Sequence, residues 1–205
     1  MGRSNVGRVL LILALGLLVI ATTAMGQGKV QTKADRMEWR NGGKEVILTG
    51  GVEVRITAGK GAEIVLTAGD VIYSKEKETV TATATPKVVQ GALSAAGESI
   101  TVDAKTGNIT VAKGTLKGAD ATAKADAISI ALYEAELKGA AELTTDMGTF
   151  SGATLKLSFT AEGKLNRFIS EQSKGSIGEP AKPTSSAPPA KKPAPTKKPA
   201  PKGKK

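Results

Sequence analysis

Hydrophobic and polar residues alternate one by one over much of the chain. In the segment LTGGVEVRI, residues 48–56, Val52, Val54 and Ile56 alternate with charged residues after a pair of glycines. Successive side chains of a β-strand point to opposite faces, so this alternation predicts a strand with one buried face. Similar alternation recurs through residues 29–172, where helical periodicity is rare. The pattern predicts an all-β domain.

Five segments share one layout: a small residue, usually followed by Gly or Asp, then a strand, a polar turn and a second strand. They begin at Ala34, Ala68, Ala96, Ala125 and Ser151, at intervals of 34, 28, 29 and 26 residues. The turn sequences RNGGKE, SKEKE, DAKTGN and TAEGK supply the Gly, Asn and charged residues that hairpins need. A unit of this size cannot bury its apolar face alone, so the repeats are expected to stack as roughly ten or more short antiparallel strands.

One segment also suits a helix by composition. Residues 127–143, AISIALYEAELKGAAEL, are rich in Ala, Leu and Glu, but Ile128, Ile130 and Leu132 alternate with smaller residues and Gly139 is expected to end the piece. The repeat favours strands here. Pro86 is expected to close the Thr-rich strand before it or to lie at a sheet edge, because proline cannot donate to a strand ladder.

The beginning of the chain has the layout of a secretory signal peptide. Arg3 and Arg8 precede an apolar run at residues 9–21, and small residues follow just before Gln27. The run of thirteen residues is shorter than the about twenty that span a membrane comfortably. We expect cleavage before Gln27 and an exported protein, with a retained membrane anchor as the alternative.

The net charge of +10 belongs to the other end of the chain. Residues 180–205 carry eight lysines and no acid, whereas residues 27–179 carry 19 basic and 19 acidic residues. Proline, alanine and lysine without an apolar period predict a disordered tail, either simply solvated or in contact with anionic envelope surfaces. The neutral middle and the export signal argue against nucleic acid. The predicted domains are a signal peptide at 1–26, a β domain at 27–174 and a disordered tail at 175–205.

The chain offers little catalytic chemistry. It has no His and no Cys, so it lacks the usual general base near neutral pH, the commonest zinc ligands and any disulfide. The pairs Glu76/Glu78 and Glu134/Glu136 are expected on solvated faces rather than as glycosidase carboxylates. Three single aspartates are expected to cap turns rather than bind calcium; they are Asp35, Asp70 and Asp126. We expect no enzymatic activity, no metal and no cofactor.

The first repeat carries a more specific pattern. Ala34 and Asp35 are followed by an aromatic residue, Trp39, and then by Gly50, Gly51 and Val52 at the start of the next strand. This resembles the OstA-like family, the periplasmic lipopolysaccharide-transport proteins of the LptA and LptC type, whose usual sequence motif is A-D-x-x-x-Y … G-N-V. Glycine replaces the commoner Asn here. The second repeat keeps Ala68, Asp70 and Tyr73 with one residue inserted, and the fourth keeps Ala125 and Asp126 but loses the aromatic residue.

The resemblance implies both a fold and a function. The fold would be repeated antiparallel strand pairs forming an open, twisted jelly-roll, or β-taco. The function would be non-enzymatic binding of lipopolysaccharide through its lipid A acyl chains, in a bridge that carries it from the inner to the outer membrane. Partners would be other OstA-like domains, or a second copy head to tail, joined by edge-strand pairing. Within the family, a cleavable signal favours the soluble bridge component in the periplasm, and the alternative is a component anchored in the inner membrane and facing the periplasm.

The residues expected to contact acyl chains are those on the inward rows of the strands. They are Trp39, Val52, Val54, Ile56, Ile64, Leu66, Ile128, Ile130, Leu155 and Leu157. The aliphatic members would look the same in a dry sandwich core, so the lipid role comes from the resemblance. The alternative function is a structural β-repeat protein that self-assembles as a scaffold of the cell envelope.

Overall fold

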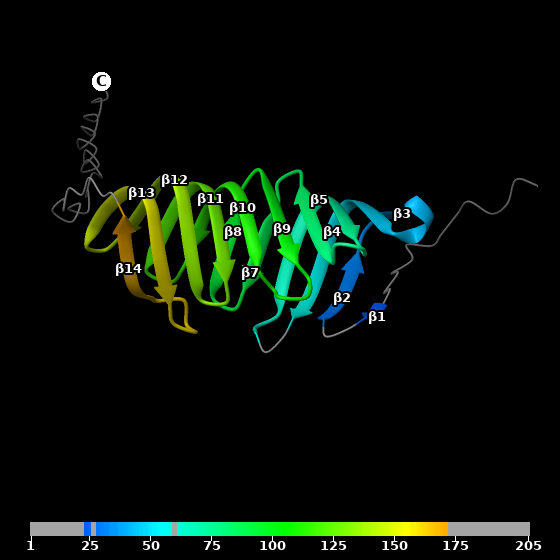
Figure 1. The fold of residues 1–205 in the computed structure, drawn as a ribbon, viewed down its shortest axis with the longest axis horizontal. Coiled ribbons are helices and arrows are strands. Elements are labelled where there is room, and N and C mark those ends of the chain that lie inside the picture. Colours follow the sequence, from blue (N-terminus) through cyan, green and yellow to red (C-terminus); the bar gives the residue numbers. More distant parts are fainter. Residues whose placement is uncertain (1–22, 26–27, 59–60, 172–205) are drawn as a thin grey trace, which may run out of the picture.

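The computed structural model describes residues 23–25, 28–58 and 61–171 (Figure 1). The disordered tail predicted for residues 175–205 lies outside these residues. So does the predicted signal peptide, except that residues 23–25 form a strand beside the next one. The predicted domain boundaries therefore stay predictions. No helix in the described part of the chain is long and apolar enough to cross a membrane.

Fourteen strands and one short 3-10 turn make up the described structure, and every strand pairs antiparallel with its neighbours. Their bounds are β1 (Thr23–Met25), β2 (Gly28–Lys33), β3 (Arg36–Arg40), η1 (Asn41–Gly43), β4 (Glu45–Ala58), β5 (Ile64–Ser74), β6 (Thr79–Thr83), β7 (Lys87–Gln90), β8 (Leu93–Ala96), β9 (Ser99–Asp103), β10 (Ile109–Lys117), β11 (Ala121–Ala131), β12 (Glu134–Thr145), β13 (Gly148–Phe159) and β14 (Leu165–Glu171). The all-β, repeated strand-pair fold expected from the sequence is confirmed.

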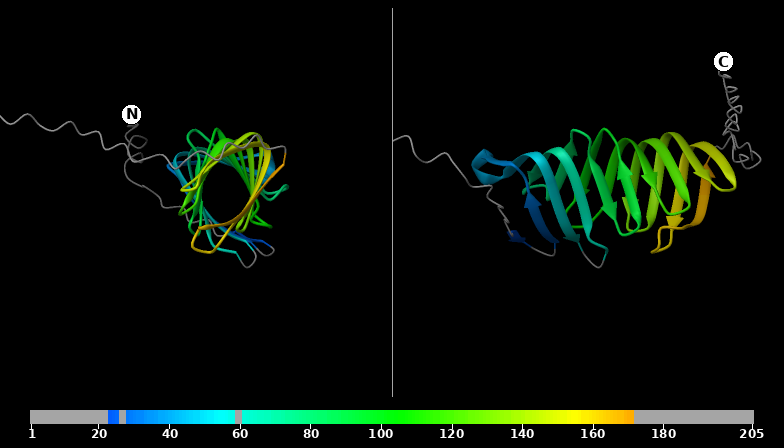
Figure 2. Two further views of the ribbon diagram at one scale, coloured as in Figure 1. Left: turned by 90° about the vertical axis from the view of Figure 1, so that its left-hand side faces the viewer. Right: turned by 180° about the vertical axis from the view of Figure 1, so that it is seen from behind.

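The continuous sheet folds over on itself, so that its two halves face each other. Within β5, residues 70–74 pair with β6 and residues 64–67 pair with β7. Within β10, residues 109–112 pair with β9 and residues 115–117 pair with β8. The long strands therefore pass from one half to the other. Seen along its long axis, the molecule is a ring of strands around an elongated interior (Figure 2).

We call the two halves sheet I and sheet II. Sheet I contains β3, residues 45–49, residues 70–74, β6, β9, residues 109–112, 127–131, 134–138 and 154–159, and β14. Sheet II contains β1, β2, residues 52–58, 64–68, β7, β8, and residues 114–117, 121–125, 141–145 and 148–152.

Several strands are longer than the short ones expected. β4 has 14 residues and β12 has 12, because each crosses from one sheet to the other through an irregularity in its pairing. The register shifts between Thr49 and Val52 in β4 and between Lys138 and Ala141 in β12. A β-bulge bends its strand and increases the local twist, which lets one strand serve both sheets.

Glycines form the corners at these crossings. Gly50 and Gly51 have φ of 75° and 53°, and Gly139 has φ of 74°. These left-handed conformations cost L-residues with a Cβ about 1–2 kcal/mol, whereas glycine adopts them freely. Gly139 was expected to end its segment; this was wrong, because Gly139 lies inside β12 and the turn lies at residues 132–133. Residues 127–143 are otherwise strands, as the repeat indicated.

Each repeat predicted from the sequence begins where the chain passes from sheet II to sheet I. Ala34 precedes β3, Ala96 ends β8, and the other three starts lie at the register changes of β5, β11 and β13. The polar turns of the repeats are the hairpin turns of sheet I. Pro86 follows the end of β6, in the connection that leads to β7, as expected.

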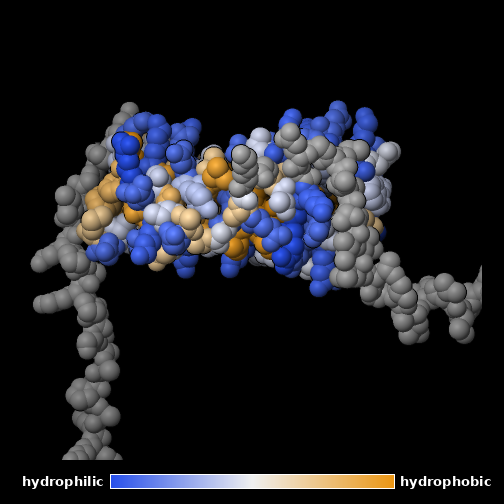
Figure 3. Space-filling view, turned by 90° about the horizontal axis from the view of Figure 1, so that it is seen from below, coloured by the Kyte–Doolittle hydropathy of each residue, from blue (hydrophilic) through white to orange (hydrophobic). Residues whose placement is uncertain are grey.

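The two sheets meet along a second side without a shared strand among the described residues. This seam is lined by hairpin turns, such as the β13–β14 connection on the lower side of Figure 1. Two hydrogen bonds hold it at one place: the Ala119 N–H donates to the Gly163 carbonyl at 2.7 Å, and the Leu165 N–H donates to Asp120 Oδ1 at 2.8 Å. Seen from this side, hydrophobic residues show between the polar ones (Figure 3). Strands thus join the sheets on one side and turn contacts on the other.

Candidate functional site

The interior between the sheets is the first candidate site. Nine of the ten residues expected to contact acyl chains lie there, and none exposes more than 3% of its surface. Sheet II contributes Val52, Val54, Ile56, Ile64 and Leu66, and sheet I contributes Ile128, Ile130, Leu155 and Leu157. The sequence thus identified an inward row on each sheet. Their contact with lipid stays a prediction.

Sequence reasoning left out most of the other residues of the same core. Leu48, Val71, Val80, Ile100, Val102, Ile109, Val111, Leu116, Leu137 and Leu143 are all buried in one cluster with the nine. The signal that could have found them is the same period-2 alternation, continued along every strand. Alanines such as Ala82, Ala95 and Ala123 are also buried, so the core is built largely from small and branched aliphatic groups.

The interior is closely packed in this conformation. Between the sheets, the described residues line a hollow of ≈ 20 Å³ near the end formed by β3 and one of ≈ 0 Å³ beside β7 and β8. A water molecule needs at least about 10–15 Å³, so neither hollow has room for an alkyl chain. Chains could enter between the sheets only if the sheets part or side chains rotate.

Trp39 lies at the end of the interior rather than in its core. Its side chain is 50% exposed, and it borders the small hollow with Met37 from the same strand and with Tyr73 of β5. The Lys75 ammonium lies 4.5 Å from the centroid of the Trp39 ring, a cation–π contact at the rim. Burial raises the pKa of the Tyr73 hydroxyl. At this end, which we call the Trp39 mouth, the apolar side chains of Met37 and Trp39 and the ring of Tyr73 border the interior, with the positive charge of Lys75 beside them.

The opposite end of the molecule also presents aromatic groups. The rings of Phe150 in β13 and Phe168 in β14 are tilted against each other, with centroids 4.7 Å apart. Both rings are only partly buried and pack against the edge of the core. β14 pairs with β13 alone, just as β3 pairs with β4 alone among the described strands. Each end of sheet I thus has a free strand edge next to apolar side chains.

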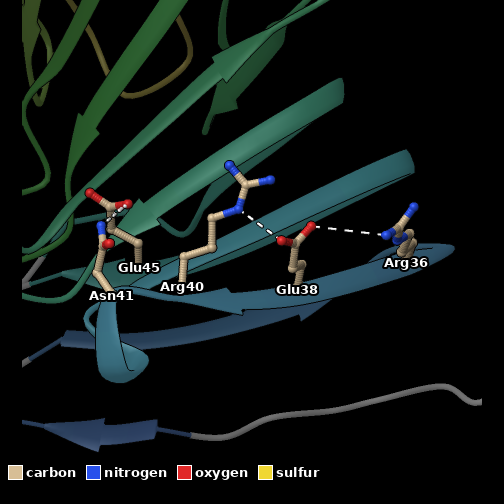
Figure 4. A network of polar contacts seen from close by, with 5 residues as sticks. All are labelled: Arg36, Glu38, Arg40, Asn41 and Glu45. Atoms are coloured by element: carbon tan, nitrogen blue, oxygen red, sulfur yellow. Dashed lines mark hydrogen bonds and ion pairs between the residues drawn. The ribbon is translucent and has the colours of Figure 1, made fainter.

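The outer face of β3 is charged, in contrast to its inner face. Arg40 Nε donates to Glu38 Oε1 at 2.8 Å, and Arg36 lies 3.9 Å from the other carboxylate oxygen (Figure 4). The hydrogen bond from Arg40 lowers the pKa of Glu38, so this carboxylate stays ionised. At the turn, Asn41 Nδ2 donates to Glu45 at 2.7 Å. β3 is therefore amphipathic, with polar groups outside and Met37 and Trp39 inside.

A larger hollow, of ≈ 520 Å³, lies on the outer face of sheet I over β10–β14. Glu134 and Glu136 line it, together with Lys156 and Arg167. Lys156 Nζ donates to Glu171 at 2.8 Å; this bond raises the pKa of Lys156 and lowers that of Glu171. Lys156 and Glu171 therefore both stay charged. A carboxyl that acts as a general acid needs a raised pKa, whereas the pKa of Glu171 is lowered. The two glutamates lie on a solvated outer face, as the sequence indicated.

The aspartates and glycines of the family-like motif lie at the corners. The Asp35 N–H donates to the Gly50 carbonyl at 3.0 Å, and a Cβ on Gly50 would lie 2.5 Å from Asp35 Oδ2. Asp126 lies against Gly139 in the same way at a later corner. The motif therefore shapes the fold rather than a binding site. In the described part of the chain, no three acidic residues are grouped so as to hold a metal ion.

No family model matches the sequence, and no curated protein matches it. Among solved structures, the chain is similar to the crystal structure of LptH, the LptA-homologous periplasmic component of the lipopolysaccharide transport device of Pseudomonas aeruginosa. The two chains are 18% identical with a TM-score of 0.43, and the match covers 50% of this chain and 76% of that chain. At this level the likeness assigns neither family nor function.

Proposed function

We propose that this protein binds a glycolipid with several acyl chains, of the lipopolysaccharide type, and acts without enzymatic turnover. One observation carries the proposal: the inward faces of both sheets form a single apolar cluster along the molecule. The resemblance of the first repeat to OstA-like proteins names the lipid class. The acyl chains would lie between the sheets, among the inward rows of sheets I and II.

The energetics favour such an interior. Each CH₂ group removed from water contributes about 0.8 kcal/mol, so even partial cover of several chains stabilises the complex strongly. For the chains to enter, the two sheets would have to separate. Separation along the seam would break the fewest interactions between them. Along it the described sheets are joined by turn contacts, such as the Leu165–Asp120 hydrogen bond, whereas whole strands join them at the corners.

The free edges suggest how such a protein would act in a bridge. β3 at one end and β14 at the other each have one unpaired edge among the described strands. An exposed edge can pair with a strand of another chain by β-augmentation. In the proposed periplasmic role, these edges would join sister domains or a second copy head to tail. The expected signal peptide and basic tail fit an exported protein near anionic envelope surfaces.

The same edges favour a second candidate, a scaffold that assembles end to end and carries no lipid. Native mass spectrometry of the purified mature protein with purified lipopolysaccharide separates the two. The proposal predicts a stoichiometric complex in which the lipid is bound and chemically unchanged. Assembly into long rods without bound lipid would contradict the proposal and support the scaffold.

A further inference from the structure

Gln90 is the one polar residue in the buried core of the described structure. It ends β7 with its side chain directed into the interior, and only 4% of its surface is exposed. Its Oε1 atom has no hydrogen-bond partner among the described residues. A buried acceptor without a partner destabilises a fold, and buried polar groups are nearly always paired. The orphan oxygen therefore calls for an explanation.

Ordered water does not provide one in this conformation. The hollow beside Gln90, which Leu93, Ile109 and Ile130 also line, has a volume of ≈ 0 Å³. A water molecule needs about 10–15 Å³ and two to four polar partners. The surroundings are almost wholly aliphatic. None of the described residues around the amide supplies a donor to Oε1 in this conformation.

Gln90 also lies where the interior meets the seam. A Cβ built on Gly61, in the β4–β5 turn, would lie 3.9 Å from Gln90 Nε2 and 2.8 Å from Leu132 Cδ2. Leu132 belongs to the β11–β12 turn on the other sheet, and it is 52% exposed with φ of 56°. A non-glycine residue with this φ is strained. Gly61 thus lies between Gln90 and the Leu132 side chain, at the seam.

We propose that the Gln90 amide oxygen accepts a hydrogen bond from a bound amphiphile, at the junction between its alkyl chains and its polar head. The donor would be an amide N–H or a hydroxyl close to the chains. This inference rests on the proposed lipid-binding function and narrows its ligand class. With chains between the sheets and the head outside the seam, that junction lies at the depth of Gln90. Lipids whose chains are joined only by esters have no donor there.

The test replaces Gln90 with methionine, which has a similar length and no hydrogen-bonding amide. The matched control is Gln31→Met, because Gln31 is exposed on β2. Two probes with several chains and two phosphates are compared: lipid A, with amide-linked 3-hydroxyacyl chains, and cardiolipin, with ester-linked chains. Binding of each to the full mature protein is titrated by native mass spectrometry, and thermal unfolding is measured without lipid.

Gln90→Met should weaken lipid A binding by about three- to tenfold, the worth of one neutral hydrogen bond. It should leave any cardiolipin binding unchanged and raise the lipid-free unfolding midpoint by about 2–4 °C, because an unpaired buried acceptor is removed. Gln31→Met should change none of these. If Gln90→Met weakens binding of both lipids equally, or does not weaken lipid A binding, the role of Gln90 is wrong while the proposed function stands. If the wild-type protein binds neither lipid, the proposed function fails with it.

Discussion

At the scale of single residues, the corners explain why the most recognisable motif occurs where it does. Asp35 and Gly50 touch because the chain must turn from one sheet to the other with almost no space between backbone segments. The pair at Asp126 and Gly139 repeats this arrangement six strands later along the sheet path. A sequence pattern that suggested a family therefore has a direct geometric cause.

Gly50→Ala should destabilise the fold more than Gly42→Ala. Both glycines have a left-handed φ, 75° and 63°, so each alanine costs about 1–2 kcal/mol. A Cβ at Gly42 would meet nothing within 4 Å, whereas a Cβ at Gly50 would meet Asp35 Oδ2 at 2.5 Å. Overpacking should add a further cost of about 1–3 kcal/mol. Urea unfolding of the two variants measures the difference, and equal losses would show that the corner is not tightly packed.

At the scale of elements, the sequence predicted strands, turns and inward rows well, because these depend on local alternation and turn chemistry. Val54 and Ile64 were placed on an inward face from their neighbours alone. The crossing of long strands between sheets was not predicted, because the alternation continues on both sides of a corner and only glycine or a small residue marks the place. The interruption at Gly139 was therefore mistaken for an end.

The buried amide of Gln90 and the Trp39 mouth were also missed, for a different reason. A glutamine after Val88 and Val89 gives no sign that its side chain lies between two sheets, since that depends on how β7 is paired. The same holds for Trp39, which was expected among lipid-contacting residues but lies half exposed at the end of the molecule. Strand pairing between distant repeats decides both positions.

The β9–β10 turn should make stability depend on pH through Asp103. Backbone N–H groups of Thr106 and Lys105 donate to Asp103 Oδ1 at 2.8 and 2.9 Å, and the bond from Thr106 is the main reason that the pKa of Asp103 is lowered. A carboxyl whose pKa is lower in the folded state stabilises the fold above its unfolded pKa, near 3.9. That contribution is lost as pH falls through the lower folded value.

Asp103→Asn should therefore be less stable than the wild type at neutral pH, with the difference shrinking as pH falls below about 4. Denaturant unfolding between pH 7 and pH 2 measures the effect, and the two proteins should converge at the acid end. A difference that stays constant across this range would mean that the turn does not depend on the charge of Asp103.

At the scale of the whole molecule, the two sides of the fold are closed differently, and its outer and inner faces differ in polarity. Strands that cross at the corners hold the two sheets together along one side, and turn contacts close the other side. The outer faces carry exposed ion pairs such as Arg55–Glu53, which contribute little to stability but keep the surface polar. The inner faces of the described sheets are apolar apart from Gln90. In the proposed function, such a molecule opens along the seam and takes alkyl chains between its sheets.

Photo-crosslinking tests this central claim most directly. A photoreactive residue is placed at Val54, Ile64 or Leu157, which point inward, and at the outward neighbours Glu53 and Lys156. Circular dichroism selects the variants that fold, and each is irradiated with purified lipopolysaccharide. We predict capture of lipid at the inward positions and none at the outward ones. Equal capture on both faces, or capture at no position by folded protein, would contradict binding of the chains between the sheets.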